Sequence, residues 1–93
     1  MVNEKIIESK LAAAIRATGG WSLKLWPVSV SGLPDRMVLM PGGVIRFVEL
    51  KSTGKKSTPR QLVVHSQLRK LGFAVDVIDT EQQLQQFLNQ FCK

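Results

Sequence analysis

The sequence is poor in cysteine, in acidic residues and in long apolar runs. Its one cysteine, Cys92, excludes an internal disulfide and a cysteine-based zinc site, and it agrees with a reducing compartment. No apolar run approaches the roughly 20 residues of a membrane-spanning helix, and residues 1–5 lack the pattern of a signal peptide. We therefore expect a cytoplasmic protein with no membrane partner.

The shortage of acidic residues makes the chain strongly basic. Seven Asp and Glu stand against 13 Lys and Arg, which gives a formal net charge of +6. This balance favours a polyanionic partner such as nucleic acid, although many small basic proteins bind none. Four of the seven acids lie in the segments that are candidates for a site, and if they meet at a metal ion the remaining surface is more basic still. These four are Glu4, Glu8, Asp35 and Glu49.

Length and periodicity predict one α/β domain over residues 1–93. The short Pro41-Gly42-Gly43 turn predicts an antiparallel hairpin, and Pro27 places the first strand at an edge or a bend. The order αβββαβα predicts a mixed sheet. A domain of this size is marginal alone, so self-association remains open. The predicted elements are a helix over 3–18, strands over 21–30, 36–40 and 44–51, a helix over 58–71, a strand over 73–78 and a helix from residue 80.

Three residues at the hairpin are candidates for chemistry. Asp35 follows a Gly-Leu-Pro turn at the mouth of the hairpin, and the two-residue period places Glu49 and Lys51 on one face of its second strand. A Glu-x-Lys pair by itself mostly marks a strand that runs out into solvent. Here the hairpin brings Asp35 beside Glu49 on the neighbouring strand. Such a pair of carboxylates suits a hard cation such as Mg²⁺.

Four segments, in order and at these distances, carry a specific resemblance: Gly32-Leu33-Pro34-Asp35, Pro41-Gly42-Gly43, Phe47-Val48-Glu49-Leu50-Lys51 and Thr58-Pro59-Arg60-Gln61. They resemble the VRR-NUC domain, a branch of the PD-(D/E)xK nucleases with standalone phage and bacterial members. The resemblance covers nearly the whole chain. It implies a restriction-endonuclease-like αβββαβ core with a mixed sheet and a C-terminal helix, in a bacterial cell or a phage-infected host.

The resemblance also implies an Mg²⁺- or Mn²⁺-dependent endodeoxyribonuclease. Asp35, Glu49 and the backbone carbonyl of Leu50 would bind the metal, and Lys51 would position or help to deprotonate the attacking water. A cation lowers the pKa of water and offsets charge on the scissile phosphate. The implied products carry a 5′-phosphate and a 3′-hydroxyl.

The family further places a catalytic, metal-binding glutamate on the first helix. Glu4 and Glu8 both lie on the side of Leu11 and Ile15. We assign the role to Glu8, because its spacing to Gly19 resembles that of related archaeal junction resolvases. The alternative for either residue is an acid of the first turn favoured by the helix dipole, and it fits Glu4 better.

Gln61 has two explanations, which could hold in turn. In the family it contacts the active site and counts among the catalytic residues, whereas its place three residues after Thr58 also fits a capping box. His65, alone on this helix, is interpreted as a surface or core residue rather than a catalytic one. The expectation that Lys24 points toward the site rests on the resemblance alone. We expect three basic residues to contact DNA phosphates, the alternative being a solvated loop: Lys55, Lys56 and Arg60.

The expected substrate is DNA selected by its shape, because the chain has no evident second module that reads base sequence. Standalone family members resemble dimeric nucleases that act on branched DNA, which implies four-way (Holliday) junctions and paired cuts. One alternative is a nicking or flap nuclease without junction preference. Another is a catalytically silent DNA-binding module of the same fold, against which the acid pair argues because it repels phosphate.

A homodimer is expected from the small core, from the single site per chain and from an apolar stripe on the last helix. Most of this stripe is better explained as part of its own subunit's core. The strand edge near Trp26 or the hairpin would then serve for dimerisation. The stripe consists of Leu84, Phe87, Leu88 and Phe91.

Overall fold

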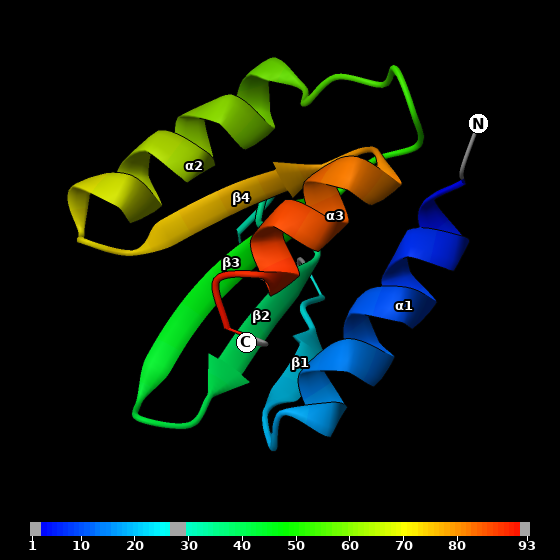
Figure 1. Cartoon of the computed structure of the whole chain (residues 1–93). Helices are drawn as coiled ribbons and strands as arrows, with labels where there is room; N and C mark the ends of the chain where they lie inside the picture. Colours follow the sequence, from blue (N-terminus) through cyan, green and yellow to red (C-terminus); the bar gives the residue numbers. More distant parts are fainter. Residues whose placement is uncertain (1–2, 27–29, 92–93) are drawn as a thin grey trace.

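The protein, seen in a computed structural model, is a four-stranded sheet with helices on both of its faces (Figure 1). The structure describes residues 3–26 and 30–91. The predicted α/β order and mixed sheet are confirmed, whereas Pro27 and Cys92 lie outside the described residues. The elements are α1 (Glu4–Ala17), β1 (Trp21–Lys24), β2 (Arg36–Met40), β3 (Val44–Leu50), α2 (Pro59–Lys70), β4 (Ala74–Ile78) and α3 (Glu81–Leu88).

The strands lie side by side in the order β1-β2-β3-β4. β1, β2 and β3 pair antiparallel, and β3 pairs parallel with β4. A parallel pair needs a crossover connection, which α2 provides. β1 therefore occupies an edge, as predicted, but it ends at Lys24 rather than continuing toward residue 30.

α1 and α3 pack on one face of the sheet and form the main core. Ile7, Leu11 and Ile15 recur at helical spacing on α1 and are fully buried against Val38 and Val48 of the sheet. The apolar stripe of the last helix closes the same core, so it serves its own subunit and leaves no dimer surface there. Its exposed fractions are 1% for Leu84, 2% for Phe87 and 6% for Leu88, with Phe91 packed against them.

The helices begin at side-chain caps. Thr58 and Gln61 form the predicted capping box: Gln61 N donates to Thr58 Oγ1 at 3.1 Å, and Thr58 N donates to Gln61 Oε1 at 2.8 Å. This exchange fixes the start of α2 beside the end of β3.

Across the described ranges, none of the helices has the length and apolar character needed to span a membrane.

Candidate active site

The turn that precedes β2 holds Asp35 in place. Gly32 has φ +85°, and a Cβ there would lie 2.9 Å from the backbone oxygen of Arg60. The left-handed conformation and the close approach both require glycine. Arg60 Nε in turn donates to Ser31 O at 3.3 Å and to Ser31 Oγ at 3.1 Å. The start of α2 is thereby tied to the segment that leads into Asp35.

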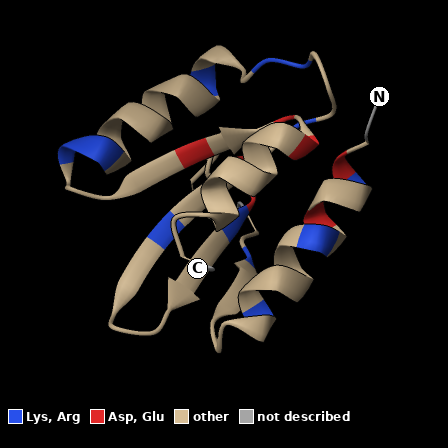
Figure 2. Cartoon of the chain, viewed as in Figure 1, with Lys and Arg blue, Asp and Glu red and all other residues tan. Residues whose placement is uncertain are grey.

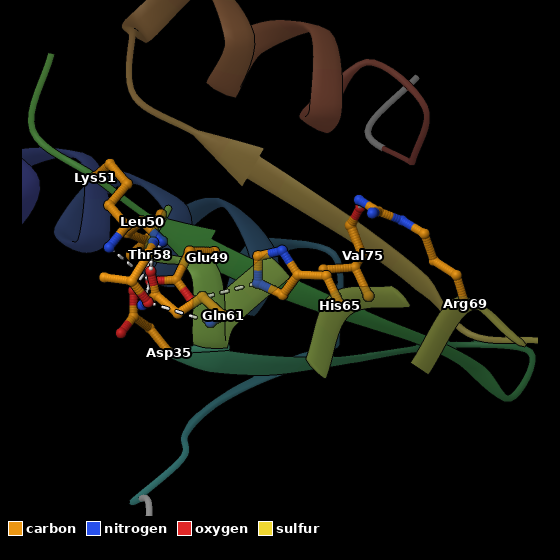
Figure 3. A network of polar contacts seen from close by, with 9 residues as sticks. All are labelled: Asp35, Glu49, Leu50, Lys51, Thr58, Gln61, His65, Arg69 and Val75. Carbon is orange, nitrogen blue, oxygen red and sulfur yellow. Dashed lines mark hydrogen bonds and ion pairs between the residues drawn. The ribbon is translucent and has the colours of Figure 1, made fainter. Parts of the chain in front are cut away.

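Asp35 and Glu49 converge at one end of the hairpin (Figure 3). Arg36 pairs with Val48 in the antiparallel register, so the residue before Arg36 faces the residue after Val48. Asp35 Oδ2 also accepts a hydrogen bond from the backbone N of Leu50 at 2.8 Å. The short turn and the two-residue period of the strand thus bring together the two carboxylates that the sequence analysis identified as candidates.

Glu49 is a buried acid, 1% exposed, in a polar network. Its Oε2 accepts a hydrogen bond from Gln61 Nε2 at 3.1 Å and lies 3.5 Å from Lys51 Nζ. Burial, followed by the charge of Asp35 and a hydrogen bond between the two carboxyl groups, raises the pKa of Glu49 to about 8, although Lys51 opposes the shift. At neutral pH the metal-free site therefore holds a proton.

His65, interpreted from the sequence as a surface or core residue, is a core residue that lies beside Glu49. It is fully buried, and its Nε2 lies 3.7 Å from Glu49 Oε1. Neither ring nitrogen has a hydrogen-bond partner within the described part of the chain. Burial, then the charges of Arg69 and Lys51, lowers its pKa, which keeps the ring neutral. The available signal was its spacing: it follows Gln61 by four residues, on the same side of α2.

Gln61 performs both of its expected tasks in one conformation. Its backbone N and side-chain oxygen close the capping box with Thr58, while its side-chain nitrogen holds Glu49. The carboxylate is therefore anchored to the first turn of α2. Thr58 supports this contact indirectly, because it fixes the turn from which Gln61 reaches the site.

The glutamates of α1 are not joined to the carboxylate pair. Glu8 Oε1 forms an ion pair with Arg36 at 3.0 Å, and no contact among residues 3–26 and 30–91 links Glu8 to Asp35 or Glu49. Arg36 directly follows Asp35, so side-chain alternation turns it to the α1 face of the sheet. Glu4 occupies the first turn, as an acid favoured by the helix dipole does.

Basic residues lie on the loop between β3 and α2, part of which is blue at the top of Figure 2. Lys55 and Lys56 are exposed on this loop, and Arg60 is exposed on the first turn of α2. Lys24 instead lies over the ring of Trp26, with Nζ 4.9 Å from the ring centroid. The loop and the start of α2 therefore carry positive charge next to the carboxylates, whereas Lys24 is engaged elsewhere.

The donor set fits a hard divalent cation. Mg²⁺ is commonly held by one or two carboxylates and completes its octahedron with water. Asp35 and Glu49 supply two carboxylates, and Glu49 Oε1 has no hydrogen-bond partner among the residues described. A cation between the two groups would offset the repulsion that raises the pKa of Glu49. Within the same residues, no group of three His, Cys, Asp or Glu side chains gathers to hold a metal.

Comparison with known proteins agrees with this geometry. No model of a known protein family matches the sequence. The chain is 41% identical over 81 residues to "Putative nuclease p44" of Acyrthosiphon pisum secondary endosymbiont phage 1, which covers 87% of each chain. A solved structure described as "VRR_NUC domain" matches with a TM-score of 0.88 and 33% identity, over 98% of this chain and 99% of the other. Together with the convergent carboxylates, these similarities show that the chain belongs to the VRR-NUC family of nucleases.

Proposed function

We propose that this protein is a metal-dependent endodeoxyribonuclease that hydrolyses phosphodiester bonds and leaves 5′-phosphate ends. The observation that carries the proposal is the convergence of Asp35 with a buried Glu49 whose Oε2 lies 3.5 Å from Lys51 Nζ. Phosphodiester hydrolysis needs both a cation site and a local positive charge, and the two facing carboxylates with one lysine supply the two together.

Each residue of the centre has a distinct task. Asp35, Glu49 and the carbonyl of Leu50 would hold Mg²⁺ or Mn²⁺, which when bound lowers the pKa of water and offsets charge on the scissile phosphate. Lys51 holds a positive charge beside Glu49, where it orients the attacking water. Gln61 keeps Glu49 turned toward Asp35 through its 3.1 Å hydrogen bond.

Glu8 is proposed as the fourth member of the centre, after Asp35, Glu49 and Lys51. Its partner Arg36 directly follows Asp35, so the Glu8–Arg36 ion pair lies next to the segment that carries this carboxylate. Comparing Glu8→Gln with Glu4→Gln decides the assignment. A loss of cleavage in the first variant alone supports Glu8, and equal behaviour of both variants removes it from the centre.

The proposed substrate is branched DNA such as a four-way junction, cut by a homodimer. Lys55, Lys56 and Arg60 would contact phosphates on either side of the scissile bond, and such contacts recognise the shape of the backbone rather than base sequence. The net charge of +6 on 93 residues supports a polyanionic substrate. One centre per chain supports two copies for two cuts.

The test is cleavage of a panel of four-way, flap, nicked and linear DNAs with Mg²⁺, with Mn²⁺ or with EDTA. Asp35→Asn, Glu49→Gln and Lys51→Ala should each abolish cleavage, while DNA binding in EDTA persists. Glu81→Gln changes an exposed acid of α3 that pairs with Lys10 rather than with the centre, and this variant should cleave normally. Undiminished cleavage by Glu49→Gln would refute the proposed centre, and equal rates on all DNAs would refute the junction preference.

A further inference from the structure

Trp26 is a large aromatic side chain in an exposed place. It is 69% exposed, although tryptophan is on average a well-buried residue. The exposed Lys24 places its Nζ over the ring, 4.9 Å from the ring centroid, which is the geometry of a cation–π contact. This contact orders the ring from one side. The remainder of the ring is presented to solvent as a flat aromatic surface.

The course of β1 brings Trp26 to the end of the sheet that holds the acid pair. β1 and β3 both run antiparallel to β2, so their C-terminal ends lie at the same end of the sheet. Just beyond β1, Leu25 N donates to the backbone oxygen of Asp35 at 2.8 Å, and Trp26 follows directly. Standard bond lengths added to this hydrogen bond place Trp26 Cα at most about 11 Å from Asp35 Cα. Since nucleotides advance about 3.4 Å along a stacked strand, the two positions are about three nucleotide steps apart.

The partner that fits this ring is a nucleobase whose flat face is not covered by a neighbouring base. Bases stack on tryptophan through their π-faces, and the contact tolerates any base. An apolar protein surface would have to remove water from the Lys24 ammonium, which is unfavourable without a compensating charge. A nucleotide meets this requirement because it brings a phosphate with the base. The net charge of +6 favours the nucleotide further.

We infer that Trp26 is a stacking platform for an unstacked base within about three nucleotides of the scissile phosphate, an inference that rests on the proposed function. In linear duplex DNA, neighbouring bases cover both faces of every internal base, whereas a branch, flap or gap leaves a face open. Trp26 therefore favours DNA that is interrupted near the scissile bond. Phosphate contacts from Lys55 and Lys56 supply affinity for any DNA, and Trp26 supplies this selection.

The two tryptophans of the chain form a matched pair for the test. Trp21 is 66% exposed, nearly as much as Trp26. It begins β1 and pairs with Leu39, so it lies at the end of the strand away from Asp35. Trp21→Ala thus removes an equally exposed ring at the wrong end of the sheet. Trp26→Phe keeps a ring that can stack, and Trp26→Leu keeps an apolar side chain without one.

Binding in EDTA is compared between a linear duplex and the same duplex with a short gap in one strand. Stacking of one base is worth about 5- to 100-fold in affinity. Trp26→Ala and Trp26→Leu should therefore bind the gapped DNA about tenfold more weakly and the linear DNA unchanged. Trp26→Phe and Trp21→Ala should behave like the unmodified protein. The log–log salt slope of Trp26→Ala on each DNA should stay unchanged, because stacking releases no counterions.

Fluorescence gives a direct readout of the stack. Trp21→Phe leaves Trp26 as the one tryptophan of the chain, and Trp26→Phe leaves Trp21. A short oligothymidylate in EDTA should quench the first variant strongly and the second weakly. Equal quenching of the two overturns the inference. It is overturned equally if Trp26→Ala weakens linear and gapped DNA alike, or if its loss of affinity accompanies a lower mass in sedimentation, which would make Trp26 a contact between copies.

The same variants separate this inference from the proposed nuclease. Binding in EDTA needs no cleavage, so a protein that cuts no DNA but loses gapped-DNA affinity in Trp26→Ala refutes the nuclease and leaves the stacking platform standing. Conversely, an active nuclease whose Trp26→Ala variant keeps its preference for gapped DNA refutes the platform alone.

Discussion

Replacing Glu49 by glutamine should stabilise the metal-free protein at neutral and alkaline pH. The substitution keeps an oxygen that can accept the hydrogen bond from Gln61, and it removes the ionisation. Burial and Asp35 raise the pKa of Glu49 from 4.5 to about 8 in the folded protein. The unfolded chain therefore releases this proton more readily than the folded one. The contribution of Glu49 to folding stability is therefore fully present below about pH 4.5 and is lost as the pH rises to 8.

The size of this effect follows from the shift itself. At 1.36 kcal/mol per pKa unit, ionising Glu49 in the folded protein costs about 5 kcal/mol above pH 8, and about 3 kcal/mol of this is already lost at pH 7. Small proteins have a total stability of about 5–15 kcal/mol. The loss is therefore large enough to measure, and a bound cation should reverse it because it favours the ionised form.

Urea unfolding in EDTA at pH 5, 7 and 8.5 tests this reasoning. His65 contributes an opposite trend, because its lowered pKa removes stability as the pH falls below about 6.5. Both proteins contain His65 in the same buried position, so the part of its contribution that burial causes is common to both. Glu49→Gln should gain several kcal/mol over the unmodified protein between pH 5 and pH 8.5, and Mg²⁺ should stabilise only the unmodified protein. A difference that does not change with pH would refute the reasoning. Glu81→Gln, which changes an exposed acid paired with Lys10, serves as the exposed-site control.

Three further perturbations address the rest of the site. Lys55→Ala/Lys56→Ala should reduce the log–log salt slope of DNA binding by about 0.9 per lost phosphate contact; an unaltered slope would mean a merely solvated loop. His65→Leu should raise the Mg²⁺ concentration for half-maximal cleavage, because Glu49 loses a polar neighbour, and His65→Asn should partly restore it. Gln61→Ala should lower folding stability by about 1 kcal/mol and should also lower cleavage, whereas Thr58→Ala should lower only the stability. Equal cleavage by the two variants would mean that Gln61 acts only as a helix cap.

Local sequence patterns were sufficient to predict the helices and strands and the approach of Asp35 to Glu49. Helix starts and turns depend on neighbouring residues, so Thr58 with Gln61 and the Pro41-Gly42-Gly43 turn specify their structures wherever they occur. The hairpin also sets its own register. Once that register is given, the two-residue period brings Asp35 opposite Glu49 and turns Lys51 to the same side.

The packing of elements that are distant in sequence determined which residues surround the acid pair, and the spacing of residues along the chain could not predict this. The docking of α2 on β4 brings His65 against Glu49, and burial there moves both pKa values. The docking of α1 pairs Glu8 with Arg36 rather than with the acids. Similarly, the stripe of α3 faces the core of its own subunit. Periodicity specifies which residues share a face of an element, but which partner covers that face depends on how elements distant in sequence pack together.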